Sequence, residues 1–337
     1  MIEVLSSMPL CAVQDIGRFG CMRYGVSMSG AMDDLAVELG NLMLGNPAEA
    51  AAVEVPLFPF VVRFLADCRF AVTGAESPIR LDDEPVAPWW VMRARAGQTL
   101  TVDHPRHGAR AYLVVGGGIA VPEVLGSRST QIRGAFGGLE GRPLKQADRL
   151  PLTEQAASDD VDDFGLEPPA RRLALTRDGV PLLRVLPASE YQEFRPECRD
   201  AFWTAAWRIT PQSNRYGYRL SGPSILAHAP LEMRSHGIVP GVIQVPHGGQ
   251  PIVQMRDAQP TGGYAKFGAI IEADLWRLGQ CPIGSSVAFQ QVSYGEAIAA
   301  RDEVVDYRRH AARLIELHRR QAARTPLPRP VRQERDA

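Results

Sequence analysis

Short runs of alternating or β-branched residues dominate the hydrophobic pattern of the chain, and they predict a mainly β protein. Each run is bounded by Gly, Pro or Asp and has the length of a single strand. The runs occupy residues 68–75, 79–83, 98–104, 110–119, 182–188, 242–245, 251–255 and 286–293. Strands that follow one another closely, with turn residues between them, are typical of barrels and sandwiches.

Helical periodicity is confined to a few segments. Residues 32–45 carry apolar positions at helical spacing and end at Gly45, a common helix stop. We expect Ser29 or Asp33 to cap the start of this helix, where free N–H groups could hold an anion or a carbonyl oxygen. The last long pattern, residues 294–324, predicts an extended amphipathic helix. Weaker helical patterns occupy residues 188–194 and 201–207.

An acidic, proline-bearing stretch at residues 153–172 is poor in apolar residues and divides the chain. We place a linker at residues 156–172. It separates an N-terminal β domain, residues 1–155, from a C-terminal β domain, residues 173–297. Residues 298–337 are assigned to the C-terminal helix and a tail that is predicted to be disordered.

The composition is that of an ordinary soluble globular protein, with 337 residues, a formal charge of −1 and 45% hydrophobic residues. The sequence has no run of about 18 apolar residues, so we expect no membrane span. The N-terminal segment lacks the basic and apolar regions of a signal peptide, so we expect a cytoplasmic protein. Five cysteines without a CxxC motif fit reduced thiols. A charge near zero argues against nucleic acid as the main partner.

The basic residues are almost all arginine. Of the 37 Lys and Arg residues, only Lys145 and Lys266 are lysine. A compact ammonium group that can lose its proton differs chemically from a permanently charged guanidinium. A lysine that persists against this background is therefore a candidate for a chemical role.

Several motifs of enzyme chemistry are absent from the sequence. It has no GxGxxG or GxxxxGK[ST] loop, no HExxH and no Cys/His cluster. The segment DHPRH at residues 103–107 is more typical of a turn than of a metal site. We therefore expect no resident metal. An AMKM segment is also missing, so we expect no biotin on this chain.

Glycines lie beside polar residues in several separate loops, and loops on a rigid β scaffold commonly carry a binding or catalytic site. Taken singly, each Arg in these loops suits a surface ion pair, and each Asp suits a turn or a cap. Taken together, the loops indicate one site. Its candidates are Asp15, Arg18, Ser29, Asp33, Arg128, Arg142, Asn214, Arg215, Tyr218, Glu232, Gln244, Gln250, Asp257, Thr261, Tyr264 and Lys266.

The segment SHGIVPGVIQVPHGGQP, residues 235–251, places the short apolar strand 242–245 between rigid Gly and Pro corners. We interpret it as one wall of the site. The fixed backbone is predicted to aim Gln244 and Gln250 at one bound amide. The role of His247, at the exit turn, is left open.

At SGAMD, GSRST, GGLEGR, GIVPG-IQVP-GQP and TGGY-K, the sequence closely resembles the biotin-dependent carboxyltransferase family. This family includes the carboxyltransferase domain of urea carboxylase, allophanate hydrolase subunit 2 and the C subunit of 5-oxoprolinase. The resemblance runs in order from about residue 9 to about residue 297. It implies two cyclophilin-like β-barrel domains with a few helices, and a site in a cleft formed with partner-facing loops.

The resemblance implies competing functions. In a 5-oxoprolinase, ATP with Mg activates a lactam carbonyl, and water opens 5-oxo-L-proline to L-glutamate. The implied partners are a B subunit like allophanate hydrolase subunit 1 and an A subunit of the lactam-utilisation type. In a carboxyltransferase, carboxybiotin on a partner gives CO2 to urea or another amide. A third alternative is a non-catalytic regulatory partner of a kinase-inhibitor protein. A chain without a fused biotin carboxylase favours the C subunit of a 5-oxoprolinase.

The competing enzymes require similar side chains. We expect Lys266 to supply positive charge, or a base when desolvated, and Asp257 to orient it or to accept a substrate N–H. Hydrogen bonds to the substrate amide are expected from Asn214, Tyr218 and Gln244. Carboxylate or phosphate is expected to bind Arg128, Arg142 and Arg215. The other expected binding residues are Ser29, Gln250, Thr261 and Tyr264, and the expected supporting residues are Asp15, Arg18, Asp33 and Glu232.

Overall fold

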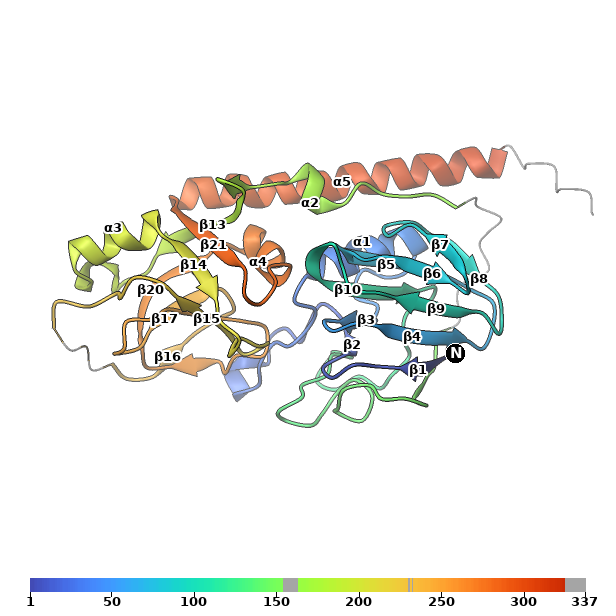
Figure 1. The fold of residues 1–337 in the computed structure, drawn as a ribbon, viewed down its shortest axis with the longest axis horizontal. Helices are drawn as coiled ribbons and strands as arrows, with labels where there is room; N and C mark the ends of the chain where they lie inside the picture. The colour runs from blue at the N-terminus through green and yellow to red at the C-terminus, as the bar shows by residue number, and fades with distance from the viewer. Residues whose placement is uncertain (154–162, 230, 232, 325–337) are drawn as a thin grey trace, which may run out of the picture.

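Two β-rich halves lie side by side in the computed structural model, and one long helix runs along both of them (Figure 1). The structure describes residues 1–153, 163–229, 231 and 233–324. Glu232, part of the expected linker and the tail from residue 325 onward therefore lie outside the described residues. The prediction of a mainly β protein with few helices and a long C-terminal helix is confirmed.

The N-terminal half consists of two separate sheets. The first has the order β11-β1-β4-β9-β6-β7, formed by Arg149–Leu150, Ile2–Ser6, Phe60–Phe64, Thr99–Val102, Ile79–Leu81 and Glu84–Val86. The second has the order β2-β3-β10-β5-β8, formed by Ala12–Gln14, Ala52–Val55, His107–Val115, Cys68–Glu76 and Met92–Ala94. Both sheets contribute alternate side chains to one largely aliphatic core, including Val62, Leu100, Val72 and Leu113.

The C-terminal half contains a closed barrel of seven strands. The barrel closes because β13 (Val180–Pro187) pairs antiparallel with β20 (Ala265–Ile270) on one side and parallel with β21 (Ser286–Gln291) on the other. Between them the order is β17-β18-β15-β14, formed by Val242–Val245, Ile252–Gln254, Gly217–Ser221 and Ala206–Ile209. Strand β12 (Thr176–Arg177) pairs antiparallel with β13 outside the ring, and β16 (His236–Gly237) forms a separate two-stranded ribbon with β19 (Thr261–Gly262).

The helices cover the sheets and join the halves. They are η1 (Met22–Tyr24), α1 (Asp34–Leu44), α2 (Pro169–Arg172), η2 (Tyr191–Glu193), α3 (Pro196–Thr204), α4 (Glu272–Gly279) and α5 (Tyr294–Arg324). Helix α5 packs against α1 of the first half and against α4 of the second. Arg308 of α5 forms an ion pair with Glu38 of α1, and the Tyr307 hydroxyl donates to the carbonyl of Glu167. Helix α5 therefore braces both halves.

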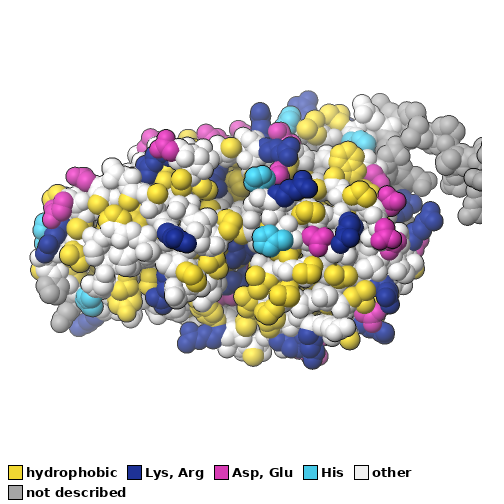
Figure 2. Space-filling model, viewed as in Figure 1, with side chains coloured by type: hydrophobic (Ala, Val, Ile, Leu, Met, Phe, Trp, Pro, Cys, Tyr) yellow, Lys and Arg dark blue, Asp and Glu magenta, His cyan; other side chains and the backbone are white. Residues whose placement is uncertain are grey.

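The surface carries charges of both signs. On the face shown in Figure 2, Lys and Arg side chains are interspersed with Asp and Glu side chains over both halves. The mixture agrees with the nearly equal numbers of basic and acidic residues, 37 and 38, in the sequence.

Local sequence signals predicted eight of the strands and the helices α1 and α5. All the predicted strands contain strand residues, and the predicted helix 294–324 is α5. Asp33 is the N-cap of α1, because its carboxylate accepts a hydrogen bond from the Ala36 N–H at 2.9 Å. Gly45 ends α1 with a φ of 76°, a left-handed conformation that favours glycine.

Two weak helix predictions are wrong in extent. Residues 188–194 contain only the short helix η2, and residues 201–207 are divided between α3 and β14. Trp207 is the reason for the second error, because its fully buried side chain fills the barrel core from strand β14. Helix α4 was not predicted. Among the described residues, no helix is long and apolar enough to cross a membrane.

Candidate functional site

A line of polar side chains crosses the outer face of the barrel on three neighbouring strands. Because side chains alternate along a strand, Ile243 and Phe267 point into the barrel core while Gln244 and Lys266 point outward. Gln244 of β17 lies opposite Lys266 of β20 in the strand register. Gln254, on the next strand, β18, continues the line.

Hydrogen bonds and an ion pair connect these side chains. The Gln254 amide donates to Gln244 Oε1 at 3.0 Å. Lys266 Nζ lies 3.2 Å from Glu190 Oε2, and the Lys266 backbone N–H donates to the same oxygen at 3.1 Å. We call Glu190, Gln244, Gln254 and Lys266 the barrel polar row.

The barrel polar row is largely shielded from solvent. Gln244 is 2% exposed, and the side chains of Lys266 and Glu190 are 14% and 16% exposed. The β16–β19 ribbon covers Gln244, and a Cβ at Gly262 would lie 2.6 Å from the Gln244 side-chain nitrogen. Only glycine therefore lets the ribbon approach the amide this closely. Thr261, beside it in the ribbon, is exposed.

The charge of Lys266 acts on its partner. Burial alone would raise the pKa of Glu190, but hydrogen bonds from Ser189 and Lys266, together with the charge of Lys266, bring that pKa below its ordinary value. Glu190 is therefore a carboxylate near neutral pH. An anionic ligand that approached Lys266 would compete with this carboxylate for the ammonium group.

A small groove adjoins the row where β17 ends and β20 begins. Its volume is about 330 Å³, and its lining includes Phe194, Leu226, His228, Val245, His247, Tyr264 and Ala265. Tyr264 is 47% exposed, and its ring stands edge-on to the His247 ring at a centroid distance of 6.5 Å. The exit turn of the segment 235–251 thus supplies one wall of a groove next to Lys266.

A second set of buried polar groups joins the two halves. Arg215 donates twice to the Asp257 carboxylate, at 2.9 and 3.0 Å. It also donates to Glu54 Oε1 of the N-terminal half at 2.6 Å. Arg110 donates to the Tyr218 hydroxyl at 2.8 Å. Together with Tyr112, which donates to Glu54 at 2.8 Å, we call these residues the junction network.

Each charge in the junction network is balanced by its neighbours. Burial alone would raise the pKa of Glu54, but Arg215 and Arg110 bring it below its usual value. Burial alone would lower the pKa of Arg215, but Asp257 and Glu54 raise it above its usual value. The network is therefore a set of charged groups whose members depend on one another across the junction.

The structure separates the two residues predicted to act as a catalytic pair. Lys266 is paired with Glu190, whereas Asp257 is paired with Arg215. Asp257 follows Gln254 by three positions, so the turn after β18 links the barrel polar row to the junction network. Arg215 and Tyr218, predicted to bind substrate, also belong to the junction network. The Asn214 side chain is exposed and accepts the Tyr216 N–H at 2.8 Å within its own turn.

The predicted aim of the two glutamines is wrong. Gln250 donates to the Gly222 carbonyl at 3.2 Å and accepts the Gly222 N–H at 3.0 Å. Gln244 instead contacts Gln254, and it donates to the Tyr264 carbonyl at 3.3 Å. The two amides therefore hold two different loops and do not converge on one point.

The N–H groups at the start of α1 are not free, so the prediction that they could hold an anion or a carbonyl oxygen is also wrong. Ser29 donates its N–H to the Arg256 carbonyl at 2.9 Å, and the Met32 N–H goes to Glu54 at 2.8 Å. The Asp33 N–H donates to the Tyr112 hydroxyl at 2.9 Å. The Ser29 donor is used by contact with the other half, and the Met32 and Asp33 donors are used within the N-terminal half. Burial raises the pKa of the Asp33 carboxyl to about 7.

Asp15 and Arg18 brace the loops of the N-terminal half. The Asp15 carboxylate accepts hydrogen bonds from the Ser127 hydroxyl at 2.7 Å, from the Arg128 N–H at 2.5 Å and from the Ser129 hydroxyl. Arg18 is fully buried and donates to the Ser129 carbonyl at 2.6 Å. These contacts fit the supporting role that the sequence predicted for both residues.

Arg128 and Arg142 are occupied by local carboxylates. Arg128 lies 2.7 Å from Glu123, whose side chain is 52% exposed. Arg142 lies 2.7 Å from Asp148 and 2.8 Å from Glu140, whose side chain is 70% exposed. A ligand phosphate or carboxylate would compete with these partners. The exposed Glu123 and Glu140 contribute little stability, whereas Asp148 is buried and accepts two hydrogen bonds from Arg142.

Five residues of these clusters were missed from the sequence: Glu54, Arg110, Tyr112, Glu190 and Gln254. Glu54 stands in the otherwise apolar run AAVEVP, and an isolated carboxylate in a buried strand is a detectable signal. Gln254 lies in the strand segment PIVQM, where its polarity alone does not distinguish it. Glu190 carries no local signal. In the part of the chain that the structure describes, no group of three or more His, Cys, Asp or Glu side chains could hold a metal ion.

Comparisons with known proteins cover both halves of this arrangement. Residues 24–291 match the family model described as carboxyltransferase domain, subdomain A and B. The chain is 44% identical over 313 residues to the C subunit of 5-oxoprolinase from Escherichia coli, a match that spans 91% of this chain and 96% of that protein. It is 40% identical over 321 residues to the C subunit of 5-oxoprolinase from Haemophilus influenzae, with 94% and 99% covered.

A solved structure supports the same fold. The Kluyveromyces lactis urea amidolyase superposes with a TM-score of 0.81 at 30% identity. The superposition covers 91% of this chain but only 20% of the urea amidolyase chain. The chain therefore corresponds to one part of that much larger protein.

Proposed function

The chain belongs to the carboxyltransferase-domain family with subdomains A and B, and from that membership we propose that it works as the C subunit of a 5-oxoprolinase. The observation that carries this function is similarity along nearly the whole length of two 5-oxoprolinase C subunits. The urea amidolyases, in contrast, match over a small part of their length. The chain is an enzyme subunit, and the role of a C subunit implies A and B subunits as its partners.

The reaction proposed for the complex is the opening of 5-oxo-L-proline to L-glutamate with consumption of ATP, in the cytoplasm. ATP, bound with Mg in the complex, supplies the energy that activates the lactam carbonyl. On this chain, Arg128 and Arg142 would hold phosphate or carboxylate oxygens. The exposed partners Glu123 and Glu140 are weakly held, so a ligand oxygen could replace them while Asp148 stays on Arg142.

We propose the barrel polar row as the part of the chain that meets the substrate amide. A lactam presents one N–H donor and one carbonyl acceptor, and Gln244 and Gln254 offer both kinds of group. Lys266 supplies a cation that would leave its ion pair with Glu190 and pair instead with the substrate carboxylate or with negative charge that develops in the reaction. Tyr264 and Thr261 belong to the ribbon segment above the row and complete the proposed binding surface.

The junction network is proposed to position this surface. Asp257 holds Arg215, and the turn between Gln254 and Asp257 connects the network with the row. In this proposal Asp257, Arg215 and Tyr218 act through the backbone that they fix. Asn214, Gln250 and Ser29 fix neighbouring loops in the same way.

We also propose that each β half is a cyclophilin-like domain, with boundaries at residues 1–155 and 173–297 and a linker between them. The closed ring of seven strands supports this assignment for the second half. For the first half, support comes from two sheets that share one core.

A second candidate function is transfer of CO2 from carboxybiotin on a partner to urea or another amide. The likeness to the urea amidolyase structure favours this alternative. The proposed binding surface suits both reactions, since each has an amide substrate and develops negative charge on oxygen.

Co-expression with the A and B subunits tests the proposal. The purified complex should form glutamate from 5-oxoproline only when ATP is present and only when all three proteins are present. A complex that forms no glutamate but carboxylates urea in an avidin-sensitive reaction would replace the 5-oxoprolinase proposal with the carboxyltransferase one.

A further inference from the structure

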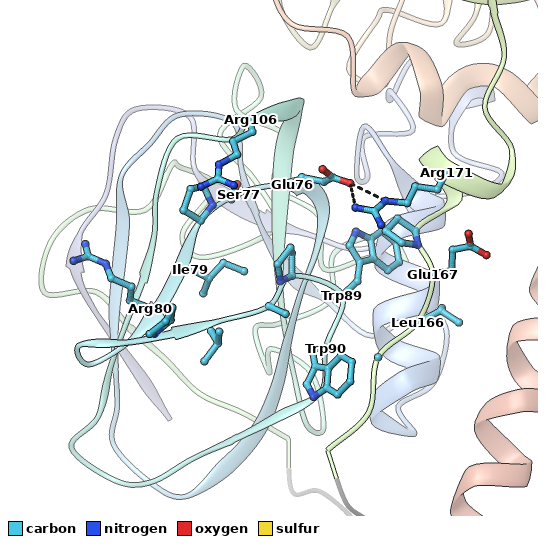
Figure 3. A pocket seen from close by; sticks show the side chains of 17 residues that line it. Glu76, Ser77, Ile79, Arg80, Trp89, Trp90, Arg106, Leu166, Glu167 and Arg171 are labelled. Atoms are coloured by element: carbon cyan, nitrogen blue, oxygen red, sulfur yellow. Dashed lines mark hydrogen bonds and ion pairs between the residues drawn. The ribbon is translucent and has the colours of Figure 1, made fainter.

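A larger pocket lies in the N-terminal half and contains no residue of the barrel polar row. Its volume is about 890 Å³, within the range of small-molecule sites. Its walls come from the end of β5, from β6 and β7, from the turn at residues 87–90 and from the segment 165–168 (Figure 3). The pocket therefore belongs to a different part of the molecule from the proposed lactam site.

One side of the pocket is apolar and flat. It is lined by Ile79, Val86, Trp89, Trp90 and several prolines. Trp90 is 41% exposed, and Gly165 packs so closely against its ring that any side chain at that glycine would overlap the indole. The indole is thus fixed from one side and open on another. Such a surface suits a flat aromatic ring.

The turn that presents these rings is strained. Trp89 has a φ of 59°, a left-handed conformation that is unusual for a bulky residue. Its indole N–H donates to the Gly74 carbonyl at 3.0 Å, and the side chain is 3% exposed. Adjacent residues are therefore held so that Trp89 enters the core while Trp90 faces the pocket.

The end of the pocket near Ser77 offers two donors that have no acceptor. Ser77 is 2% exposed, and among the described residues its hydroxyl has no hydrogen-bond partner. Arg106 lies beside it in Figure 3. The Arg106 backbone N–H donates to the carbonyl of Glu76, the residue before Ser77, at 2.9 Å, which holds the two segments together. Within the described part of the chain, the Arg106 guanidinium makes no hydrogen bond or ion pair. A buried hydroxyl without a partner is unfavourable unless a ligand supplies one.

The other cations around the pocket are already paired. Arg171 lies 3.0 Å from Glu76, and Arg80 lies 3.2 Å from Asp103. Glu167 adds a further carboxylate to the wall. One free guanidinium and one free hydroxyl match a single carboxylate, whereas a doubly charged phosphate would face repulsion from Glu76 and Glu167.

We infer that this pocket binds a flat aromatic carboxylate, with its carboxylate on Arg106 and Ser77 and its ring against Trp90. The site is additional to the proposed 5-oxoproline site, because neither its residues nor its elements are shared with the barrel polar row. Its occupancy does not depend on ATP or on the partner subunits.

Calorimetric titration of the full chain with 2-naphthoate tests this inference, with the neutral isostere 2-naphthamide as the comparison ligand. Saturable binding of 2-naphthoate is expected, with the amide at least about tenfold weaker. Arg106→Gln should weaken 2-naphthoate binding about tenfold, and Ser77→Ala several-fold. Arg80→Gln is the matched control, because Arg80 lines the same pocket but is paired, and it should change the affinity less than about twofold.

Three results would overturn the inference. They are equal binding of the acid and the amide, equal weakening by Arg106→Gln and Arg80→Gln, and a lack of saturable binding at millimolar 2-naphthoate. Thermal melting of each variant shows whether it is folded, and Arg106 and Arg80 are both exposed, so their variants are expected to melt like the parent.

Discussion

The two halves of the molecule differ in whether their sheets have edge strands with unpaired backbone groups. The C-terminal half closes seven strands into a ring, so the barrel has no free edge, and its polar row lies on the outer face under a ribbon. The N-terminal half leaves β7 and β8 at the edges of two sheets. Residues 163–168 run along this open side, and the larger pocket forms between them and the edge.

The cores differ in the same way. In the barrel, the Phe202 ring lies 4.0 Å from the Phe267 ring and 4.8 Å from the Phe289 ring, measured between centroids. The N-terminal core is dominated by Val, Leu and Ile side chains from two facing sheets. A closed ring encloses a compact space that large rings fill, whereas two sheets interlock many smaller side chains. The barrel core thus relies more on large aromatic rings, and the two-sheet core relies more on smaller aliphatic side chains.

The most damaging change is expected in the barrel core. Phe202→Ala should lower the free energy of unfolding by about 3–5 kcal/mol, because it removes a fully buried ring that touches several others. Leu113→Ala in the N-terminal core is the comparison, and denaturant unfolding measures both. If the leucine variant lost more stability than the phenylalanine variant, the contrast between an aromatic and an aliphatic core would be wrong.

Breaking the junction should have a cost of similar size. Arg215→Met leaves Glu54 and Asp257 as buried carboxylates without their shared cation, and a loss of about 3–5 kcal/mol is expected. Arg219→Met, on the exposed side of the same strand, is the control and should stay within about 0.5 kcal/mol. Equal stability of the two variants in urea unfolding would show that the halves do not depend on the network.

The barrel polar row is tested by the two lysines of the chain. Lys266→Arg keeps the charge but changes its geometry, and the complex is expected to lose roughly a hundredfold in kcat for glutamate formation. Lys145→Arg provides the matched control in the N-terminal half and should change kcat less than about twofold. Unchanged turnover in Lys266→Arg would remove Lys266 from its proposed role.

The smallest expected effect concerns pH at the junction, where Gln280 of the second half donates to Asp33 at 2.8 Å. The pKa of Asp33 is raised to about 7, above the value of about 3.9 for an unfolded chain, because the carboxyl is buried. The folded state therefore binds the proton more tightly, and this contribution to stability is lost as the pH rises from about 4 to about 7.

Asp33→Ser removes the titrating group and retains a side chain that caps helices. From pH 5 to pH 8, the parent should lose roughly 2–3 kcal/mol of unfolding free energy relative to the variant. Urea unfolding at several pH values measures the two slopes. Parallel pH profiles would show that Asp33 does not titrate in this range.

The fold could be predicted well where the signal is local. The bounds of strand 242–245 and helix 294–324 were predicted to the residue. The signals that define them, turn residues and helical periodicity, come from residues close together in the sequence. The site was harder. Lys266 was found through composition, and Gln244 through its place in a fixed strand. Glu190, which pairs with Lys266 from 76 positions away, carries no local signal.

Long-range docking explains the errors. The contact between Arg215 and Glu54 joins residues 161 positions apart, and no local pattern reports it. The sequence does not show that the Arg256 carbonyl accepts the Ser29 N–H or that Glu54 accepts the Met32 N–H, so it predicts these donors as free for a ligand. The sequence likewise predicts that Gln250 faces a ligand, because it does not show the hydrogen bonds of Gln250 with Gly222, 28 positions earlier.

Helix α5 also fixes an order of assembly. It has 31 residues and is about 46 Å long, and of the described elements it is the last to leave the ribosome. Both β halves are synthesised completely before it, so each can fold while the other is still unclamped. The contacts of Arg308 with Glu38 of the first half and of Tyr307 with Glu167 then form last. Translation that stops before residue 294 would release two folded halves held together without α5, by the junction network and by contacts such as that of Gln280 with Asp33.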